Sequence, residues 1–166
     1  MLRTVRTLLV GLNILNWICV AAFAIVVALL MAGVPAIEAR ILRAFPDSAE
    51  AVSRFTMLAM IAGMAVGVAA HVVFRKLVAI VDTVAHGAPF SAVNADRLRA
   101  IAWALLAIQL LDIAYGVSAI NVSEATGEYF GWNPTIGGWL AVLLLFVLAR
   151  VFRQGADMQD ELAATV

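Results

Sequence analysis

The feature that most constrains the fold is a series of four apolar stretches, each about as long as a membrane-crossing helix. A helix needs roughly 20 apolar residues to cross about 30 Å of hydrocarbon. We therefore predict an all-α fold, an integral membrane four-helix bundle that forms a single transmembrane domain over residues 1–166. The predicted spans lie approximately at residues 8–32, 55–74, 101–120 and 136–151, and the last is the shortest.

The composition supports a membrane setting and argues against strongly charged partners. Hydrophobic residues make up 64% of the chain and charged residues 13%, with a mean hydropathy of +1.01. A soluble domain, by contrast, carries about 25% charged residues. The 11 basic and 11 acidic residues cancel, so no overall field attracts nucleic acid. We expect the lipid bilayer as a partner and no direct contact with nucleic acid.

Motifs for metal binding and catalysis are missing from the sequence. Cys19 is the only cysteine, which excludes an internal disulfide and a Cys-rich zinc site. The chain also lacks a Gly-rich phosphate loop, a nucleophile elbow and a zinc-protease motif. We therefore expect no metal, no cofactor and no enzymatic activity.

The positions of the basic residues predict the orientation, because short loops rich in Lys and Arg stay on the cytoplasmic side. The start of the chain, the loop at residues 75–100 and the tail at residues 152–166 share one side. Eight basic residues lie on or beside these segments: Arg3, Arg6, Arg75, Lys76, Arg97, Arg99, Arg150 and Arg153. The opposite side has three basic residues, Arg40, Arg43 and Arg54, and nearby acidic residues balance their charge. We predict that both termini are cytoplasmic.

The connections between the spans contain readable signals. Apolar residues at helical spacing between Pro35 and Pro46 predict a short amphipathic helix on the outer surface. Gly87 can end the second helix, and Ser91 or Asn94 caps the third. Three aromatic residues suit the membrane interface: Tyr129, Trp132 and Trp139.

Several polar residues interrupt the apolar stretches, and Asp112 is the most costly of them. A buried Asp at the centre of a membrane helix costs about 2.5–3.5 kcal/mol on insertion scales. Gln109 shares its helix face at i, i+3 spacing, and Asn13 and Asn16 also stand three apart. In the second stretch, small residues step by four and end in an imidazole: Ala59, Gly63, Gly67 and His71. Such a seam favours close helix packing.

Two interpretations of these polar residues stay open. Asp112 is either a structural anchor that hydrogen-bonds to Asn13, Asn16 or Gln109, or part of a proton or cation relay with His71. No Gly or Pro interrupts the middle of the third span and the halves of the chain show no repeat, so the signs of a secondary transporter are missing. A homo-oligomer could still form a pathway between protomers.

Two further motifs resemble a known family. The loop before the third span reads "GAPFSAVNADRLRAIAW", and the chain ends in "VFRQGADMQDELAATV". Together they resemble DUF2975, a bacterial family of four-span membrane proteins of unknown function. The residues that carry the resemblance are Pro89, Phe90, Asn94, Arg97, Leu98, Phe152, Gly155, Asp160, Glu161, Thr165 and Val166.

The resemblance implies a function at the inner face of the membrane. Members of this family are commonly encoded beside a small Cro/CI-type helix-turn-helix regulator. We therefore expect a non-enzymatic bacterial inner-membrane protein that regulates or sequesters such a regulator. The residues expected to bind it are Pro89, Phe90, Asn94, Arg97, Arg99, Arg153, Gly155, Asp157, Asp160 and Glu161.

Two alternatives remain beside this expectation. The chain could be a small ion-coupled or solute-handling membrane protein organised around Asp112, with the other intramembrane polar residues Asn13, Asn16, His71 and Gln109. The loop and the tail could also form a salt bridge that only closes the bundle, worth about 0–1 kcal/mol if it is exposed.

Overall fold

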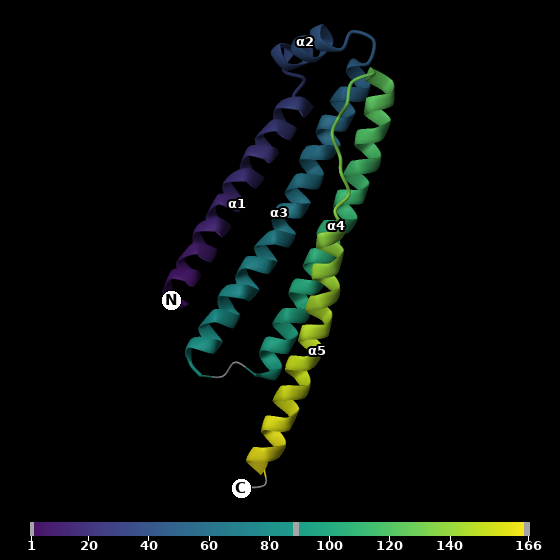
Figure 1. Cartoon of the computed structure of the whole chain (residues 1–166). Coiled ribbons are helices and arrows are strands. Elements are labelled where there is room, and N and C mark those ends of the chain that lie inside the picture. Colours follow the sequence, from purple (N-terminus) through teal and green to yellow (C-terminus); the bar gives the residue numbers. More distant parts are fainter. Residues whose placement is uncertain (1, 88–89, 165–166) are drawn as a thin grey trace.

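All regular elements in the described part of the chain are helices (Figure 1). The structure, a computed structural model, describes residues 2–87 and 90–164, without the side chains of residues 160 and 162–164. Four of the helices are long and apolar enough to cross a membrane, which confirms the all-α class and the predicted number of long apolar helices. The five helices are α1 (Leu2–Met31), α2 (Pro35–Ala44), α3 (Ala49–Ala85), α4 (Ala92–Thr126) and α5 (Ile136–Ala164).

The ends of the long helices follow from residues that stop or start a helix. Gly87 follows α3 with φ 81°, and Gly127 follows α4 with φ 71°, a left-handed conformation that Gly adopts readily. The Ser91 hydroxyl caps α4 by accepting a hydrogen bond from the Asn94 N–H at 3.3 Å. The prediction of Ser91 as the cap is confirmed, and the alternative of Asn94 is wrong.

The short helix α2 occupies the position predicted between Pro35 and Pro46. Pro35 lies at the start of the helix, where its missing N–H costs nothing. The helix ends at Phe45, whose N–H donates to the Ile41 carbonyl at 2.8 Å. In Figure 1, α2 lies across one end of the molecule, beside the end of α1 and the start of α3.

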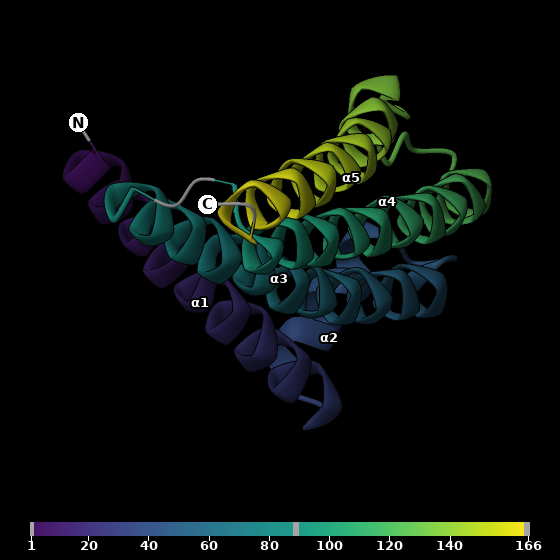
Figure 2. The same ribbon diagram turned by 90° about the horizontal axis from the view of Figure 1, so that it is seen from below.

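The four long helices form an open row. α1 packs against α3, α3 against α4, and α4 against α5. Within the described residues, α1 packs against neither α4 nor α5, and α3 does not pack against α5. Figure 2 shows α3 and α4 between the two outer helices. The predicted four-helix bundle is not confirmed, because the helices of one chain do not close into a ring.

The last helix is displaced along α4. After Thr126 the chain runs back beside α4 without helical structure, and α5 begins only at Ile136 (Figure 1). A methyl group on Gly138 would collide with the Gln109 amide, so the first turn of α5 lies at about the middle of α4. At its other end α5 continues past the α3–α4 connection (Figure 1).

The first two spans, α1 and α3, cross at the predicted seam of small residues. A methyl group on Gly63 would lie 2.7 Å from the ring of Phe23, and one on Gly67 would collide with Val20. The backbones of α1 and α3 therefore approach closely only because these positions lack side chains. Small residues of this kind are typical of helix interfaces in membranes.

Gly67→Ala should destabilise the protein, because the added methyl group meets the branched Val20 side chain. Overpacking of this kind costs about 1–3 kcal/mol, and we expect a lower melting temperature in detergent. Gly11→Ala is the matched control, since nothing lies within 4 Å of its added methyl group. An equal loss of stability in both variants would contradict the close crossing at Gly67.

Candidate functional site

A cluster of polar side chains joins α1 to α3. The Asn16 Nδ2 donates to the Gly67 carbonyl at 2.9 Å. One turn of α3 further on, His71 Nδ1 lies 2.9 Å from Asn13 Oδ1 and 3.0 Å from Trp17 Nε1. A protonated Nδ1 donates to Asn13, whereas an unprotonated one accepts from Trp17. Three of the predicted intramembrane polar residues thus lie together at this crossing.

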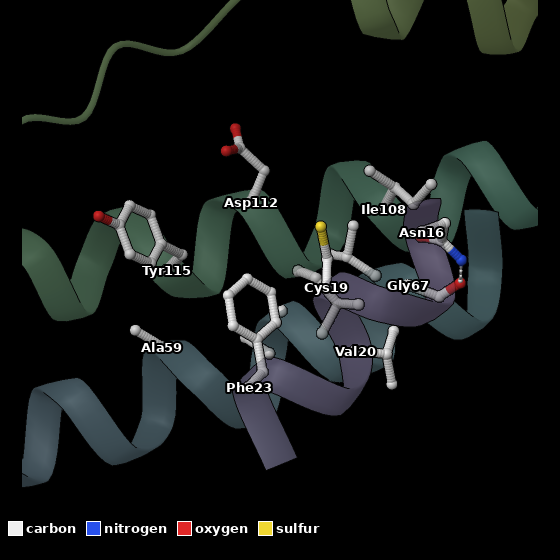
Figure 3. A pocket seen from close by; sticks show the side chains of 13 residues that line it. Asn16, Cys19, Val20, Phe23, Ala59, Gly67, Ile108, Asp112 and Tyr115 are labelled. Atoms are coloured by element: carbon white, nitrogen blue, oxygen red, sulfur yellow. Dashed lines mark hydrogen bonds between the residues drawn. The ribbon is translucent and has the colours of Figure 1, made fainter. Parts of the chain in front are cut away.

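A groove of about 340 Å³ opens between α1, α3 and α4 (Figure 3). Its lining is mainly apolar and aromatic, with Phe23 from α1 and Tyr115 from α4. Asp112 stands at its edge, and Figure 3 shows its carboxylate pointing away from Asn16 and Cys19. The groove therefore has little polar chemistry to offer a ligand.

The partner of Asp112 comes from the segment between α4 and α5. Trp132 Nε1 donates to Asp112 Oδ2 at 3.3 Å. The indole packs on α4 at Gly116, where any larger side chain would collide with its ring. The prediction that Asp112 hydrogen-bonds to Asn13, Asn16 or Gln109 is wrong. The carboxylate is bound by the segment that follows its own helix and not by α1.

Trp132 is the site residue that the sequence interpretation missed. It was expected at the membrane interface, as aromatic residues often are, but the chain turns back along α4 and brings it beside Asp112. The signal in the sequence was Gly116, one turn after Asp112 on the same face. A glycine beside a half-buried carboxylate leaves space for a large donor to approach.

The two groups of the predicted relay have separate partners. Asp112 bonds to Trp132, while His71 lies beside Asn13 and Trp17. No hydrogen bond joins His71 to Asp112 in residues 2–87 and 90–164. Gln109 is half-buried beside the first turn of α5.

At the end that holds the α3–α4 connection, Arg97 ties the two helices together. Its Nη1 donates to the Ala79 carbonyl at 2.9 Å, to Thr83 Oγ1 at 2.5 Å and to Asn94 Oδ1 at 2.8 Å. Asn94 is fully buried. Both residues were expected to bind a partner, but Nη1 of Arg97 is engaged inside the chain. These bonds position the start of α4 against α3.

The same end of the molecule also anchors α5. The rings of Phe90 and Phe152 lie 5.1 Å apart, and Arg153 Nη2 donates to Asp96 Oδ1 at 2.5 Å. A methyl group on Gly155 would lie 3.5 Å from the Phe90 ring. The loop and the tail therefore meet through a salt bridge, the contact that was expected as an alternative to partner binding. Pro89 is outside the described residues.

The predicted tail is largely a continuation of α5. The helix runs on to Ala164, and it exposes Asp157, Met158 and Glu161. Asp160 is helical, and its side chain lies outside the description. Among the side chains that the structure describes, no group of three or more from His, Cys, Asp or Glu could hold a metal ion.

Comparison with known proteins gives one match. The model of a family described as "Protein of unknown function (DUF2975)" matches residues 39–166. The chain belongs to this family. None of the curated proteins and none of the solved structures compared with it matches. The matched part contains α3, α4 and α5 of this DUF2975 protein, and α1 precedes it. The resemblance to DUF2975 is thus confirmed.

Trp132→Phe should destabilise this DUF2975 protein by about 0.5–1.5 kcal/mol, because the ring remains but its hydrogen bond to Asp112 is lost. Asp112→Asn should cost less, since the amide keeps an oxygen that can accept the bond. The measurement is thermal unfolding in detergent, arranged as a double-mutant cycle between Trp132→Phe and Asp112→Leu. The cycle should show a coupling of the same size.

Trp103→Phe serves as the control in the same cycle. The Trp103 ring packs edge-on against Phe146 of α5 at 5.3 Å, so its effect should add to that of Asp112→Leu. Additive effects of Trp132→Phe and Asp112→Leu would show that the bond contributes nothing to stability.

Proposed function

We propose that this DUF2975 protein is a non-enzymatic inner-membrane protein that binds a small cytoplasmic helix-turn-helix regulator through the end of α5. The observation that carries the proposal is the length of α5, which stays helical to Ala164 and projects past the α3–α4 connection (Figure 1). Beyond Gly155, which lies beside Phe90, about 13 Å of helix remain at 1.5 Å per residue. This projection supports a role in binding a partner.

The orientation in this proposal places both termini in the cytoplasm. The start of α1, the α3–α4 connection and the end of α5 lie at the same end of the molecule (Figure 1). The eight basic residues counted above belong to this end, and a Lys- and Arg-rich side stays cytoplasmic. Arg6 also forms an ion pair there with Asp82 at 3.0 Å, joining α1 to α3.

The chemistry of the projecting helix fits a small basic protein. Asp157 and Glu161 stand four residues apart, on one face of a helix. Met158 is 64% exposed beside them, and flexible Met side chains suit adaptable interfaces. A DNA-binding domain is positively charged, so acids on this helix would attract it and speed association. The family's usual gene neighbourhood supports a helix-turn-helix regulator as the partner.

Reversing the charge of this face should abolish binding. The variant is Asp157→Lys with Glu161→Lys in the full chain, co-expressed with the small regulator encoded beside it. We expect at least about a tenfold loss of regulator recovered with the tagged protein, because attraction becomes repulsion. Recovery is measured after extraction in neutral detergent.

The control is Glu38→Lys with Asp47→Lys, which makes the same charge change at the opposite end of the molecule. This variant should recover the regulator as well as the original chain does. Equal recovery with the α5 variant, or the absence of a regulator gene next door, would remove the support for this function.

A second candidate function, ion or solute handling at Asp112, is favoured by a different observation. The non-helical segment between α4 and α5 lies beside the middle of α4, where it exposes Asn133 and Thr135. Irregular backbone at membrane depth is tolerated only where protein buries it or water lines it. A water-filled recess reaching toward Asp112 would meet this requirement.

Cysteine labelling tests whether this segment is wet. In a Cys19→Ala background, which leaves no native thiol, Asn133→Cys should react with a membrane-impermeant thiol reagent added from the outer side. Leu144→Cys, at a 67% exposed apolar position of α5, should face lipid and stay unlabelled. An unreactive Asn133→Cys would mean a dry segment, and the ion-handling candidate would fall.

A further inference from the structure

A second groove lies between α4 and α5, at the level where both helices change from apolar to charged residues. Its volume is about 440 Å³. Arg99 precedes the apolar part of α4, and Arg150 ends that of α5. The small side chains of Ala95 and Ala149, both buried, line it. In a bilayer, the change from apolar to charged residues marks the headgroup region.

The charge of this groove is strongly positive for its size. Three guanidinium groups line it, from Arg99, Arg150 and Arg153, together with one carboxylate, that of Asp96. Asp96 is paired with Arg153 at 2.5 Å. Among the described residues, Arg99 and Arg150 form no ion pair. Two positive charges therefore remain without a neutralising partner from the described part of the chain.

An apolar surface continues from the groove into the membrane-spanning part. Phe146 lines the groove, and its ring meets Trp103 of α4 at 5.3 Å, nearly at right angles. Trp103 is 55% exposed. The site thus combines cations at the headgroup level with an exposed aromatic surface at the level of the acyl chains.

We propose that this groove binds the phosphate of an anionic phospholipid, with an acyl chain lying along Trp103 and Phe146. The planar fork of a guanidinium matches two phosphate oxygens, which makes Arg the preferred partner of this group. Basic pockets between membrane helices at the cytoplasmic side bind lipid headgroups in this manner. The site is separate from the projecting end of α5.

The net charge selects the class of lipid. A zwitterionic phospholipid also carries a phosphate, but its ammonium group would approach Arg99 and Arg150 and be repelled. An anionic lipid such as phosphatidylglycerol has no such cation. Asp96 opposes the phosphate directly, and its pairing with Arg153 reduces that opposition.

Lipid binding can be counted by native mass spectrometry of the full chain in neutral detergent, titrated with phosphatidylglycerol or phosphatidylcholine. We expect the original chain to retain phosphatidylglycerol preferentially. Arg99→Gln with Arg150→Gln should lower that affinity at least about tenfold, because charge-assisted bonds to phosphate are lost. Binding of phosphatidylcholine should stay weak and unchanged.

Two further variants separate the effect of this groove from that of overall charge and from misfolding. Arg75→Gln with Lys76→Gln removes two charges from α3 at the same end of the molecule, and it should leave phosphatidylglycerol affinity within about twofold. Asp96→Asn removes the opposing carboxylate and frees Arg153, so it should bind phosphatidylglycerol more tightly. This increase is measurable even if the double Arg99 and Arg150 variant does not fold.

Three results would overturn the proposal. An equal loss of affinity in the α3 control would mean that only the overall charge of this end matters. Equal retention of phosphatidylcholine would reduce the groove to an apolar surface. Inorganic phosphate that displaces phosphatidylglycerol at millimolar concentration, and raises the melting temperature as much, would assign the site to a soluble phosphate compound and not to a lipid.

Discussion

Hydrocarbon offers no hydrogen bonds, and this constraint governs how the chain treats the polar groups of its long helices. Asn16 donates to the backbone of Gly67 on the next helix, and Asp112 accepts from Trp132 of the segment that follows its own helix. Each bond also marks a place where a glycine lets two parts of the chain come close. Apolar helices gain no hydrophobic stabilisation by associating in lipid, because the lipid tails are as apolar as their side chains. Polar bonds and close backbone contacts of this kind therefore hold the helices together in place of a hydrophobic core.

The open row follows from the same balance. α4 has a long helix on both sides and carries most of the buried apolar side chains of the described residues. α1, which packs against α3 alone among the long helices, has no buried residue. The attachment of α1 therefore depends on its crossing with α3 and on the polar cluster around His71. The ion pair of Arg6 with Asp82 at its end is exposed and adds about 0–1 kcal/mol. Lipid on the remaining sides can satisfy the apolar surface that these helices leave open.

The sequence was sufficient for the elements and insufficient for their arrangement. Hydropathy predicted the number of long helices because the thickness of hydrocarbon sets their length, and Pro35 and Ser91 marked helix ends through local chemistry. The order of packing and the displacement of α5 depend on which helix faces meet, which helical spacing does not encode. Arg97 shows the same limit: its place in a family motif suggested a surface for a partner, but its guanidinium is bonded to α3.

The start of α5 beside the middle of α4 has a consequence for the surrounding bilayer. The apolar part of α5 covers residues 136–151, or about 24 Å at 1.5 Å per residue, while the apolar part of α1, residues 8–31, reaches about 36 Å. One flank of the molecule is thus thinner than ordinary hydrocarbon and the other is thicker. Lipids beside α5 have to compress to match it, at a cost of fractions of a kcal/mol per ångström of mismatch. The apolar surface of the protein is therefore shorter along α5 than along α1. Thin regions of membrane accommodate the α5 flank with the least deformation.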